Sequence, residues 1–303
     1  MNVRTLLRQG VEDLERAGVP SAGLAAELIL QHVIEHDRAW LYAHPEDGVE
    51  PEYAEHFLKL TARRAAGTPT QYLTGKQEFW GIEFHVGPGV LIPRPETEHV
   101  VEVALERLKP RMHPEKSDLS VRRERIGRGL RIVDVGTGSG CLAVALAKEV
   151  PQARIWATDV SRAALAVAWR NSVRHDFEAR IEFVEASLLT PFLLGGELEN
   201  VVPFDLIVSN PPYVARGALA GLAREVREHE PEEALVAGDT GLEVFRPLVR
   251  QAEKVLAPGG ALVVEVGAGQ ASDVRAMLGE GWSDIRVVND LAGIARVVSA
   301  VWR

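Results

Sequence analysis

From residue 130 to residue 303, short apolar segments alternate with segments of helical periodicity, and this alternation limits the possible folds more than any other feature. Strands that are separated by helices pair in parallel and are covered by helices on both faces. Strands are expected in LRIVDVG, ARIWATD, IEFVEAS, FDLIVSN and ALVVEVG, with two more in the segment 283–303. Helices are expected in SGCLAVALAKEV, SRAALAVAWRNSVRH and GLEVFRPLVRQAEKVLAPGG, the last ending at its Gly residues. The sequence therefore predicts an α/β domain around a mostly parallel sheet.

The segment before this domain has a different character. Apolar residues at helical spacing occur in VRTLLRQGVEDLERAG, AGLAAELILQHVIEH and PEYAEHFLKLTARRAAG. TGKQEFWGIEFHVGPGVLIP, rich in aromatic and β-branched residues between Gly and Pro, indicates a hairpin, and PRPETEHVVEVALERL then indicates a helix. We predict a helical domain in residues 1–75, a hairpin connector in residues 76–92 and the α/β domain in residues 93–303.

Composition excludes several classes of protein. The 303 residues are 46% apolar, which suffices for a substantial core, and the formal net charge of -9 argues against sequence-independent binding to nucleic acid. The first 80 residues hold eight Lys or Arg and twelve Asp or Glu, so they are not a basic arm. Cys141 is the only cysteine, and no apolar run has membrane-spanning length. We expect no secretion signal, because acidic residues precede any long apolar stretch. We expect a monomeric protein of the reducing cytoplasm without a membrane partner.

Residues 107–128 hold eight Lys or Arg against three acidic residues and show little periodicity. We interpret the segment as a solvated insertion, with a docking patch for an RNA-bearing partner as the alternative. The part from 112 to 128 has no assigned role.

A glycine loop follows the first strand of the α/β domain. Asp134, Gly136, Gly138 and Gly140 are spaced so that the backbone can turn tightly and approach a ligand at the carboxyl ends of the strands. Asp159 ends the next strand, where a carboxylate can accept hydrogen bonds from both ribose hydroxyls. The motif predicts a cofactor that contains adenosine.

The identity of that cofactor depends on what the loop lacks. A dinucleotide fingerprint requires a third glycine at position 141, which is Cys141 here, and no GKS or GKT sequence is present. S-adenosylmethionine, which has no diphosphate, fits the spacing better, and no metal ion is expected. Cys141 itself is interpreted as a small buried residue rather than a nucleophile.

The sequence Asn210-Pro211-Pro212-Tyr213 follows the strand FDLIVSN. Two prolines end the strand and hold the loop in one conformation, although a turn that only caps the strand would also explain the motif taken alone. The side-chain oxygen of Asn210 and the carbonyl oxygen of Pro211 are acceptors that can together select an NH2 group. Tyr213 offers a flat face to a planar group. We predict methyl transfer to a planar substrate that carries an amino nitrogen.

These motifs resemble the release factor glutamine N5-methyltransferase family (PrmC/HemK). DVGTGSG, ATD and SNPPY resemble motifs that this family shares with adenine-N6 methyltransferases, whereas RRAAGTPTQYLTGKQEFWGIEFHVGPGVLIPRPETE and EVREHEPEEALVAGDTGLEVFRPL resemble this family in particular. The resemblance implies a Rossmann-like class I methyltransferase fold with a seven-stranded sheet. It also implies transfer of a methyl group from S-adenosylmethionine to the glutamine amide of the Gly-Gly-Gln motif in peptide chain release factors, which the N-terminal helices would recognise.

The resemblance also implies roles for single residues. Asn210 and Pro211 would accept hydrogen bonds from the amide, and Tyr213 would be a packing wall. Asn210 would also contact the cofactor. The methionine part of the cofactor would lie against Gly136, Thr137, Gly138, Ser139 and Gly140. Asp159 would bind the ribose, and Arg94 and Glu96 are candidates near the site. Ser187 and Leu188 stand where relatives often have an acidic and an aromatic residue at the adenine.

Two other functions remain open from the sequence. An adenine-N6 methyltransferase acting on DNA or RNA would use the same Asn-Pro-Pro-Tyr chemistry but should carry a basic region that reads nucleic acid. A non-catalytic scaffold would bind S-adenosylmethionine and transfer nothing. We expect no direct nucleic-acid substrate.

Overall fold

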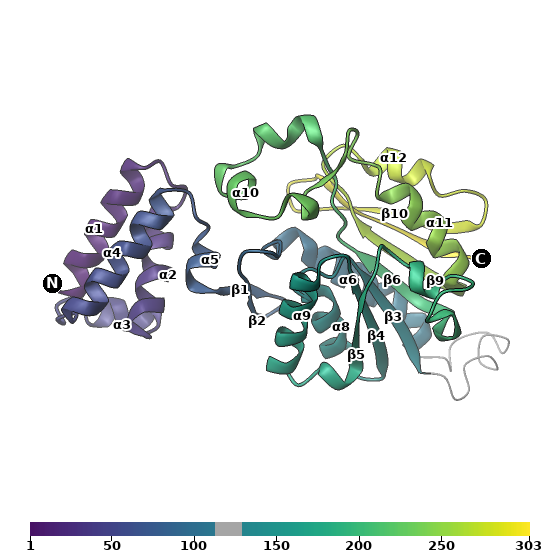
Figure 1. Ribbon diagram of the computed structural model, residues 1–303, viewed down its shortest axis with the longest axis horizontal. Coiled ribbons are helices and arrows are strands. Elements are labelled where there is room, and N and C mark those ends of the chain that lie inside the picture. The colour runs from purple at the N-terminus through teal and green to yellow at the C-terminus, as the bar shows by residue number, and fades with distance from the viewer. Residues whose placement is uncertain (113–128) are drawn as a thin grey trace. The chain divides into compact units, whose positions relative to one another are not determined.

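The computed structural model describes residues 1–112 and 129–303, which form two compact units (Figure 1). Unit 1 consists of residues 1–76, 86–88 and 222–230, and unit 2 consists of residues 77–85, 89–221 and 231–303. Among the described residues, no helix has the length and apolarity needed to cross a membrane.

Unit 1 is helical, as predicted. Its helices are α1 (Val3–Arg16), α2 (Ala22–Ile34), α3 (Arg38–Ala43), α4 (Pro51–Ala65), α5 (Thr70–Thr74) and α10 (Arg224–His229). The side chains of Leu6, Ile29 and Phe57 are fully buried and bring α1, α2 and α4 into one core. The short helices α3, α5 and α10 were not predicted, because five or six residues carry too little periodicity. The α10 helix joins this unit through an ion pair between Glu225 and the buried Arg64 of α4 (2.5 Å).

The predicted hairpin is present as β1 (Lys76–Phe79) and β2 (Ile82–His85). Its two-residue turn, Trp80 and Gly81, has positive φ at both positions (54° and 63°). This is the turn geometry that matches the twist of a two-residue hairpin, and Gly81 adopts it without a steric penalty.

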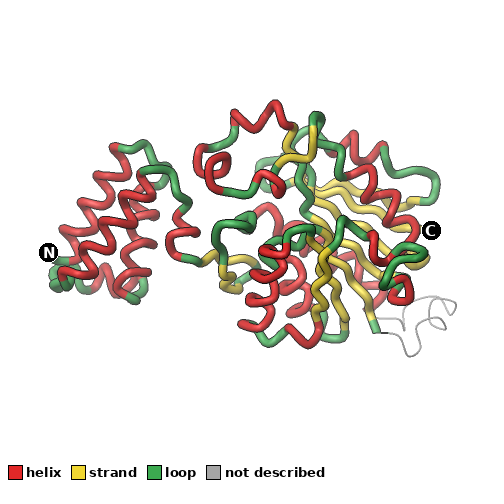
Figure 2. Tube along the Cα trace, in the orientation of Figure 1, coloured by secondary structure: helices red, strands yellow, loops and turns green. Residues whose placement is uncertain are grey.

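The sheet of unit 2 has seven strands in the order β10-β11-β9-β6-β3-β4-β5 (Figures 1 and 2), which confirms the predicted fold class. The strands are β3 (Leu130–Val135), β4 (Ala153–Asp159), β5 (Ile181–Glu185), β6 (Phe204–Ser209), β9 (Leu256–Glu265), β10 (Trp282–Asn289) and β11 (Ala295–Trp302). β11 runs antiparallel to both of its neighbours, β10 and β9, and all other neighbouring strands of this sheet are parallel. A separate two-stranded pair is formed by β7 (Val214–Ala215) and β8 (Val236–Gly238).

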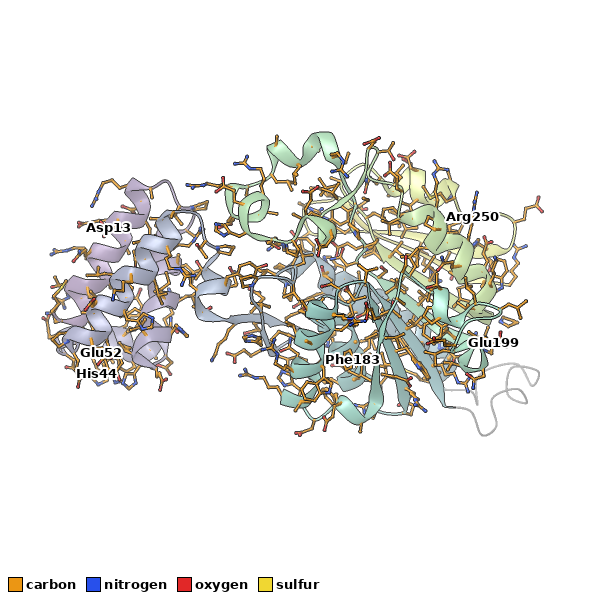
Figure 3. The ribbon with its side chains drawn as sticks, viewed as in Figure 1. Asp13, His44, Glu52, Phe183, Glu199 and Arg250 are labelled. Atoms are coloured by element: carbon orange, nitrogen blue, oxygen red, sulfur yellow. The ribbon has the colours of Figure 1, made fainter. Side chains whose placement is uncertain are left out.

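Helices cover both faces of this sheet. They are α6 (Glu98–Met112), α8 (Cys141–Glu149), α9 (Arg162–Arg174), α11 (Phe245–Val255) and α12 (Ala271–Ala276). One core cluster contains Val133 and Ile207 of the sheet together with Leu248 of α11 and Val274 of α12. Polar residues of α11 such as Arg250 remain exposed on its other side (Figure 3). α8 contacts both α6 and α9, and these three helices contact the strands β4, β5, β6 and β9.

The predicted end of α11 was wrong. The helix ends at Val255, and the following residues LAPGG already belong to β9, which pairs with β6 from Leu256 onward. The register between these strands shifts between Phe204 and Leu206, so the Pro-Gly-Gly segment is accommodated as an irregularity in the strand. The sequence suggested the end of a helix there, because Gly commonly terminates a helix and because Pro and Gly normally interrupt strands.

The interpretation of residues 107–112 as part of a solvated insertion was also wrong. These residues complete α6, and Arg107 and Arg111 are buried one turn apart on its inner face. Arg107 donates hydrogen bonds to Asp284 (2.5 Å) and to the hydroxyl of Ser299 (2.8 Å). Arg111 pairs with the carboxylate of Asp205. The number of charges in the segment could not reveal that Arg107 and Arg111 are buried and paired, because their acidic partners lie about 90 or more residues away in sequence. The remainder, 113–128, lies outside the described residues.

The buried pair predicts a specific loss of stability. The side chains of Arg111 and Asp205 are 8% and 2% exposed, so Asp205→Asn removes the carboxylate that neutralises a buried guanidinium. We expect the free energy of unfolding in urea to fall by about 3 kcal/mol. Glu182→Gln is the matched control, because it removes the carboxylate of an exposed pair with Arg154 and should change stability by about 0.5 kcal/mol or less. Equal losses of unfolding free energy in Asp205→Asn and Glu182→Gln would contradict a special contribution of the buried pair to stability.

Candidate active site

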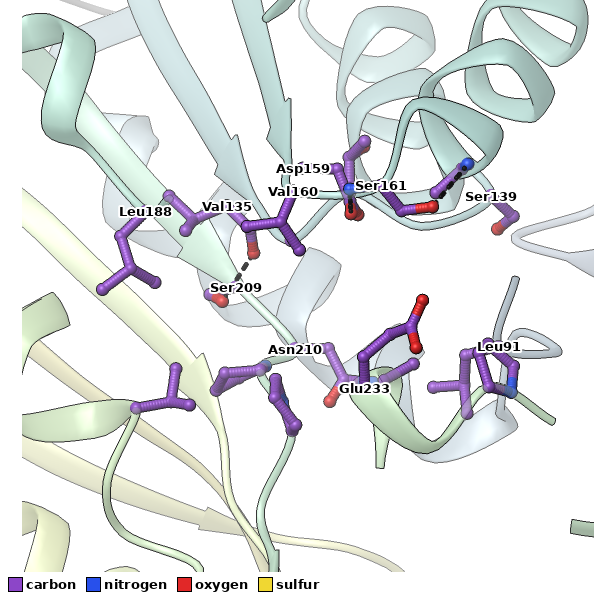
Figure 4. Close-up of a pocket in the computed structure, with 18 of the residues that line it drawn as sticks. Leu91, Val135, Ser139, Asp159, Val160, Ser161, Leu188, Ser209, Asn210 and Glu233 are labelled. Carbon is purple, nitrogen blue, oxygen red and sulfur yellow. Dashed lines mark hydrogen bonds between the residues drawn. The ribbon is translucent and has the colours of Figure 1, made fainter. Parts of the chain in front are cut away.

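A cavity of about 450 Å³ lies at the carboxyl ends of β3, β4, β5 and β6 (Figure 4). Because these neighbouring strands are parallel, their carboxyl ends meet at one edge of the sheet. The residues that end or follow the four strands and line the cavity are Val135, Gly136, Thr137, Ser139, Asp159, Val160, Ser161, Ala186, Ser187, Leu188, Ser209, Asn210, Pro211 and Pro212. The volume lies within the range of small-molecule sites in proteins.

A hydrogen bond and close helix packing hold the glycine loop in place. Gly138 has φ of +55°, and its N–H donates to Oδ2 of Asp159 (2.9 Å). Gly140 has φ of +82°, and a side chain there would meet Cβ of Ala168 at 3.0 Å, so glycine allows α8 and α9 to pack closely. Neither Gly138 nor Gly140 lines the cavity. These two glycines shape the loop, whereas Gly136, Thr137 and Ser139 form the wall.

Asp134 lies beneath the loop and not on the cavity wall. Its Oδ2 accepts hydrogen bonds from the Thr137 hydroxyl (2.6 Å) and the Ala143 N–H (3.2 Å), and its Oδ1 has no partner among the described residues. Complete burial raises the pKa of Asp134 to about 7, although the two hydrogen bonds oppose this shift. The contacts make Asp134 a support for the loop.

Asp159 faces the cavity from the end of β4. The N–H groups of Ser161 and Gly138 donate to its two oxygens, each at 2.9 Å, which fixes the orientation of the carboxylate. Burial raises the pKa of Asp159, and the backbone hydrogen bonds partly offset this effect. Glu233, which precedes β8, extends into the same cavity (Figure 4).

The charge of the lining restricts the ligand. The described lining residues include the carboxylates Asp159, Glu233 and Glu243 but no Lys, Arg or His. Such a wall offers no side-chain cation to a diphosphate and would repel it. It is compatible with a ligand that carries positive charge. This property could not be read from the sequence, because Glu233 and Glu243 reach the cavity from loops far from the glycine motif.

Asn210 stands at the edge of the cavity with its amide anchored. Its Nδ2 donates to Oγ1 of Thr97 (3.0 Å), and Oγ1 of Thr97 donates to Oε2 of Glu265 (2.6 Å). Pro211 and Pro212 also line the cavity. Sequence reasoning missed Thr97 and Glu265. Glu265 could have been found, because it ends β9, the parallel neighbour of β6.

Tyr213 is held by hydrogen bonds to residues outside the cavity lining. Its hydroxyl donates to Oε1 of Glu265 (3.2 Å), and its carbonyl oxygen accepts from Nε2 of Gln270 (2.9 Å). Burial raises the pKa of Tyr213, and the carboxylate of Glu265 adds to that effect. Tyr213 is not among the lining residues, so its assignment as a packing wall stays a prediction.

The other candidate residues are divided between lining and support. Ser187 and Leu188 line the cavity, and Leu188 has φ of +56°. The segment PRPETE, residues 93–98, contributes Pro93 and Thr97 to the lining, but neither Arg94 nor Glu96.

Cys141 lines the cavity at the start of α8 and is only 9% exposed. Burial raises the pKa of Cys141 to about 12, and no His stands among the described lining residues to act as its base. Cys141 therefore has the environment of an unreactive buried thiol.

Comparison with known proteins identifies relatives over nearly the whole chain. The family model of the PrmC N-terminal domain matches residues 5–75, and that of the methyltransferase small domain matches residues 119–228. The release factor glutamine methyltransferase of Koribacter versatilis is 40% identical over 98% of this chain and 98% of its own. Its counterpart from Nitratidesulfovibrio vulgaris is 41% identical, with 97% and 93% covered.

Solved structures give the fold. The hMettl16 catalytic domain, in a complex with MAT2A 3'UTR hairpin 1, matches with a TM-score of 0.53 and 15% identity over 89% of this chain and 87% of that one. At this identity the match shows a methyltransferase fold and nothing about the substrate. The sequence relatives are far closer. With about 40% identity along almost the full length of those proteins, this chain belongs to the release factor glutamine methyltransferase family.

Proposed function

We propose that this enzyme transfers a methyl group from S-adenosylmethionine to the side-chain amide nitrogen (N5) of the glutamine in the Gly-Gly-Gln motif of peptide chain release factors. Membership of the family supports the substrate class. The observation that carries the chemistry is the anchored amide of Asn210 at the cavity edge, where Thr97 takes the NH2 group and leaves the amide oxygen for a ligand.

The cavity suits S-adenosylmethionine. Asp159 is fixed by two backbone N–H groups and can accept hydrogen bonds from the ribose hydroxyls. Gly136, Thr137 and Ser139 would surround the methionine part, and Ser187 and Leu188 would adjoin the adenine ring. The cofactor supplies a methyl carbon on a positively charged sulfur, and the carboxylates of the lining favour that charge over a phosphate.

The substrate amide needs activation because its nitrogen lone pair is delocalised into the carbonyl group. Hydrogen bonds accepted by Oδ1 of Asn210 and by the carbonyl oxygen of Pro211 would draw the two N–H groups into place and return electron density to nitrogen. Placement of that nitrogen beside the methyl carbon supplies further acceleration through proximity. Because the nitrogen becomes acidic as it gains the methyl group, its proton can pass to water without a strong base.

The helical domain, residues 1–75, would recognise the release factor. Apolar side chains stand exposed on it: Leu24 and Leu28, one turn apart on α2, and Tyr42 and Tyr53. Exposed apolar and aromatic side chains of this kind suit a protein partner more than a nucleic acid.

The substrate assignment is tested by mass spectrometry of purified release factor after incubation with the enzyme and methyl-labelled S-adenosylmethionine. We expect one added methyl group on the glutamine of Gly-Gly-Gln, and none when that glutamine is changed to alanine. Bulk RNA and DNA in parallel reactions should remain unlabelled. Label in nucleic acid, or on another residue of the release factor, would contradict the proposal.

Substitutions of Asn210 and Asp159 should affect turnover and cofactor affinity separately. Asn210→Ala should lower kcat by about 100-fold or more, because it removes an acceptor aimed at the reacting nitrogen. The affinity for S-adenosylmethionine, measured by isothermal titration calorimetry, should stay within about threefold. Asp159→Asn should instead weaken that affinity by about tenfold or more, since it removes a charged acceptor. Weak cofactor binding by Asn210→Ala, or unchanged binding by Asp159→Asn, would reverse these roles.

A further inference from the structure

Behind Asn210 lies a chain of hydrogen bonds that ends on a buried carboxylate. Glu265 closes β9 and is 1% exposed, as is Thr97. Oε2 of Glu265 accepts from the Thr97 hydroxyl at 2.6 Å, and its Oε1 accepts from the Tyr213 hydroxyl at 3.2 Å. Nδ2 of Asn210 completes the chain at 3.0 Å from Oγ1 of Thr97. Glu265 does not line the cavity and therefore acts only through its neighbours.

The number of protons that each group can donate fixes the direction of every hydrogen bond in this chain. A carboxylate can only accept hydrogen bonds, and a hydroxyl has a single proton to donate. Because Thr97 gives its proton to Glu265, its oxygen can only accept from Asn210. The nitrogen of the Asn210 amide must then face Thr97, and its oxygen is directed away from it. The hydrogen-bond network, and not the shape of the amide, distinguishes Oδ1 of Asn210 from Nδ2.

From this geometry we infer that Glu265 is a positioning residue, which through Thr97 holds the Asn210 amide with its oxygen toward the substrate. The inference rests on the proposed function for the identity of that substrate, a primary amide. Its consequence is selectivity. A site that presents an acceptor at this point takes a group with N–H to donate, and it disfavours a carboxylate, which has none.

A neutral group in place of the Glu265 carboxylate would no longer fix the orientation of the Asn210 amide. A glutamine amide, or a protonated acid, can donate to Oγ1 of Thr97, and the Thr97 hydroxyl can then donate to Oδ1 of Asn210. The Asn210 amide would turn over and present its NH2 group to the substrate. The NH2 group of Asn210 and the NH2 group of the substrate amide are both donors and cannot hydrogen-bond to each other. A site with the Asn210 amide turned over would therefore bind the substrate amide poorly.

The charged state of Glu265 depends on the groups around it. Tyr213 and Thr97 donate hydrogen bonds to it, Arg296 of β11 stabilises its charge, and Glu96 and the Cys141 thiol lie near enough to interact with it. Burial is the largest effect and raises the pKa of Glu265, with Glu96 adding to the rise and the hydrogen bonds and Arg296 opposing it. The ordered state of the chain therefore exists above the pKa of Glu265 in the folded protein and is lost as the pH falls through it.

The first test needs no substrate. We would record the side-chain NH2 signal of Asn210 by NMR on ¹⁵N-labelled enzyme, assigned by its absence from Asn210→Asp. In the wild type one amide proton should be shifted and protected from exchange by Thr97. Glu265→Gln and Thr97→Val should alter the shift and remove the protection. Thr97→Ser, which keeps the hydroxyl, should restore both. An Asn210 signal that is the same in all variants would overturn the inference.

The second test is methyl transfer to purified release factor. Glu265→Gln and Thr97→Val should lower kcat by about 100-fold with KM changed by less than about threefold, because the hydrogen bond to nitrogen strengthens in the transition state. Thr97→Ser should recover most of kcat. The acidic limb of the wild-type pH profile should be absent from Glu265→Gln. The matched control is Glu253→Gln, the same substitution at a glutamate that accepts from Nε1 of Trp282 (3.1 Å) outside the cavity lining, and it should behave as the wild type.

The two tests separate this inference from the proposed function. Methylation by the wild type with equal kcat in Glu265→Gln and Thr97→Val would overturn the positioning role and leave the function standing. Absence of methylation by the wild type, with the expected NMR differences, would overturn the function and leave the orientation of Asn210 by Glu265 supported. Thermal unfolding of each variant distinguishes loss of fold from loss of orientation, and a kcat loss that followed melting temperature in all variants, including Glu253→Gln, would contradict the inference.

Discussion

The strands β9, β6, β3, β4 and β5 lie side by side and run parallel, and this alignment creates the site. Parallel strands place all of their carboxyl ends at one edge, so loops that are far apart in sequence are brought to the same place. Asp159 ends β4 and Asn210 follows β6, and both line one cavity. Glu265, at the end of the next strand, comes close enough to control Asn210 through Thr97. Without that alignment the same residues would be scattered over the domain.

The cavity combines fixed polar groups with an absence of side-chain cations among the described lining residues. The backbone N–H groups of Gly138 and Ser161 hold Asp159, and Oγ1 of Thr97 holds the amide of Asn210. Groups that are oriented before a ligand arrives need not be reorganised during the reaction, which is the main source of electrostatic catalysis. The supporting residues Asp134, Thr97 and Glu265 are all fully or almost fully buried, so each hydrogen bond acts with little competition from water.

Local patterns predicted much of this architecture, and long-range pairing explains what they missed. The apolar runs of β3, β4 and β6 are buried on both faces and were recognisable as strands for that reason. The glycine loop, Asp159 and Asn210 follow strands directly and could be placed at one edge. Thr97 and the inward-facing Arg107 and Arg111 could not be placed, since their partners Glu265, Asp284 and Asp205 are distant in sequence. The β9 segment LAPGG looked like the end of a helix, because only its pairing with β6 makes it a strand.

The most direct measurement is the crystal structure of the enzyme with S-adenosylhomocysteine and a release factor or a peptide that contains Gly-Gly-Gln. The account predicts that the glutamine amide nitrogen lies within hydrogen-bonding distance of both Oδ1 of Asn210 and the carbonyl oxygen of Pro211, with Nδ2 of Asn210 still bound to Thr97. A glutamine amide bound elsewhere in the cavity, or an Asn210 amide whose nitrogen faces the substrate, would contradict it.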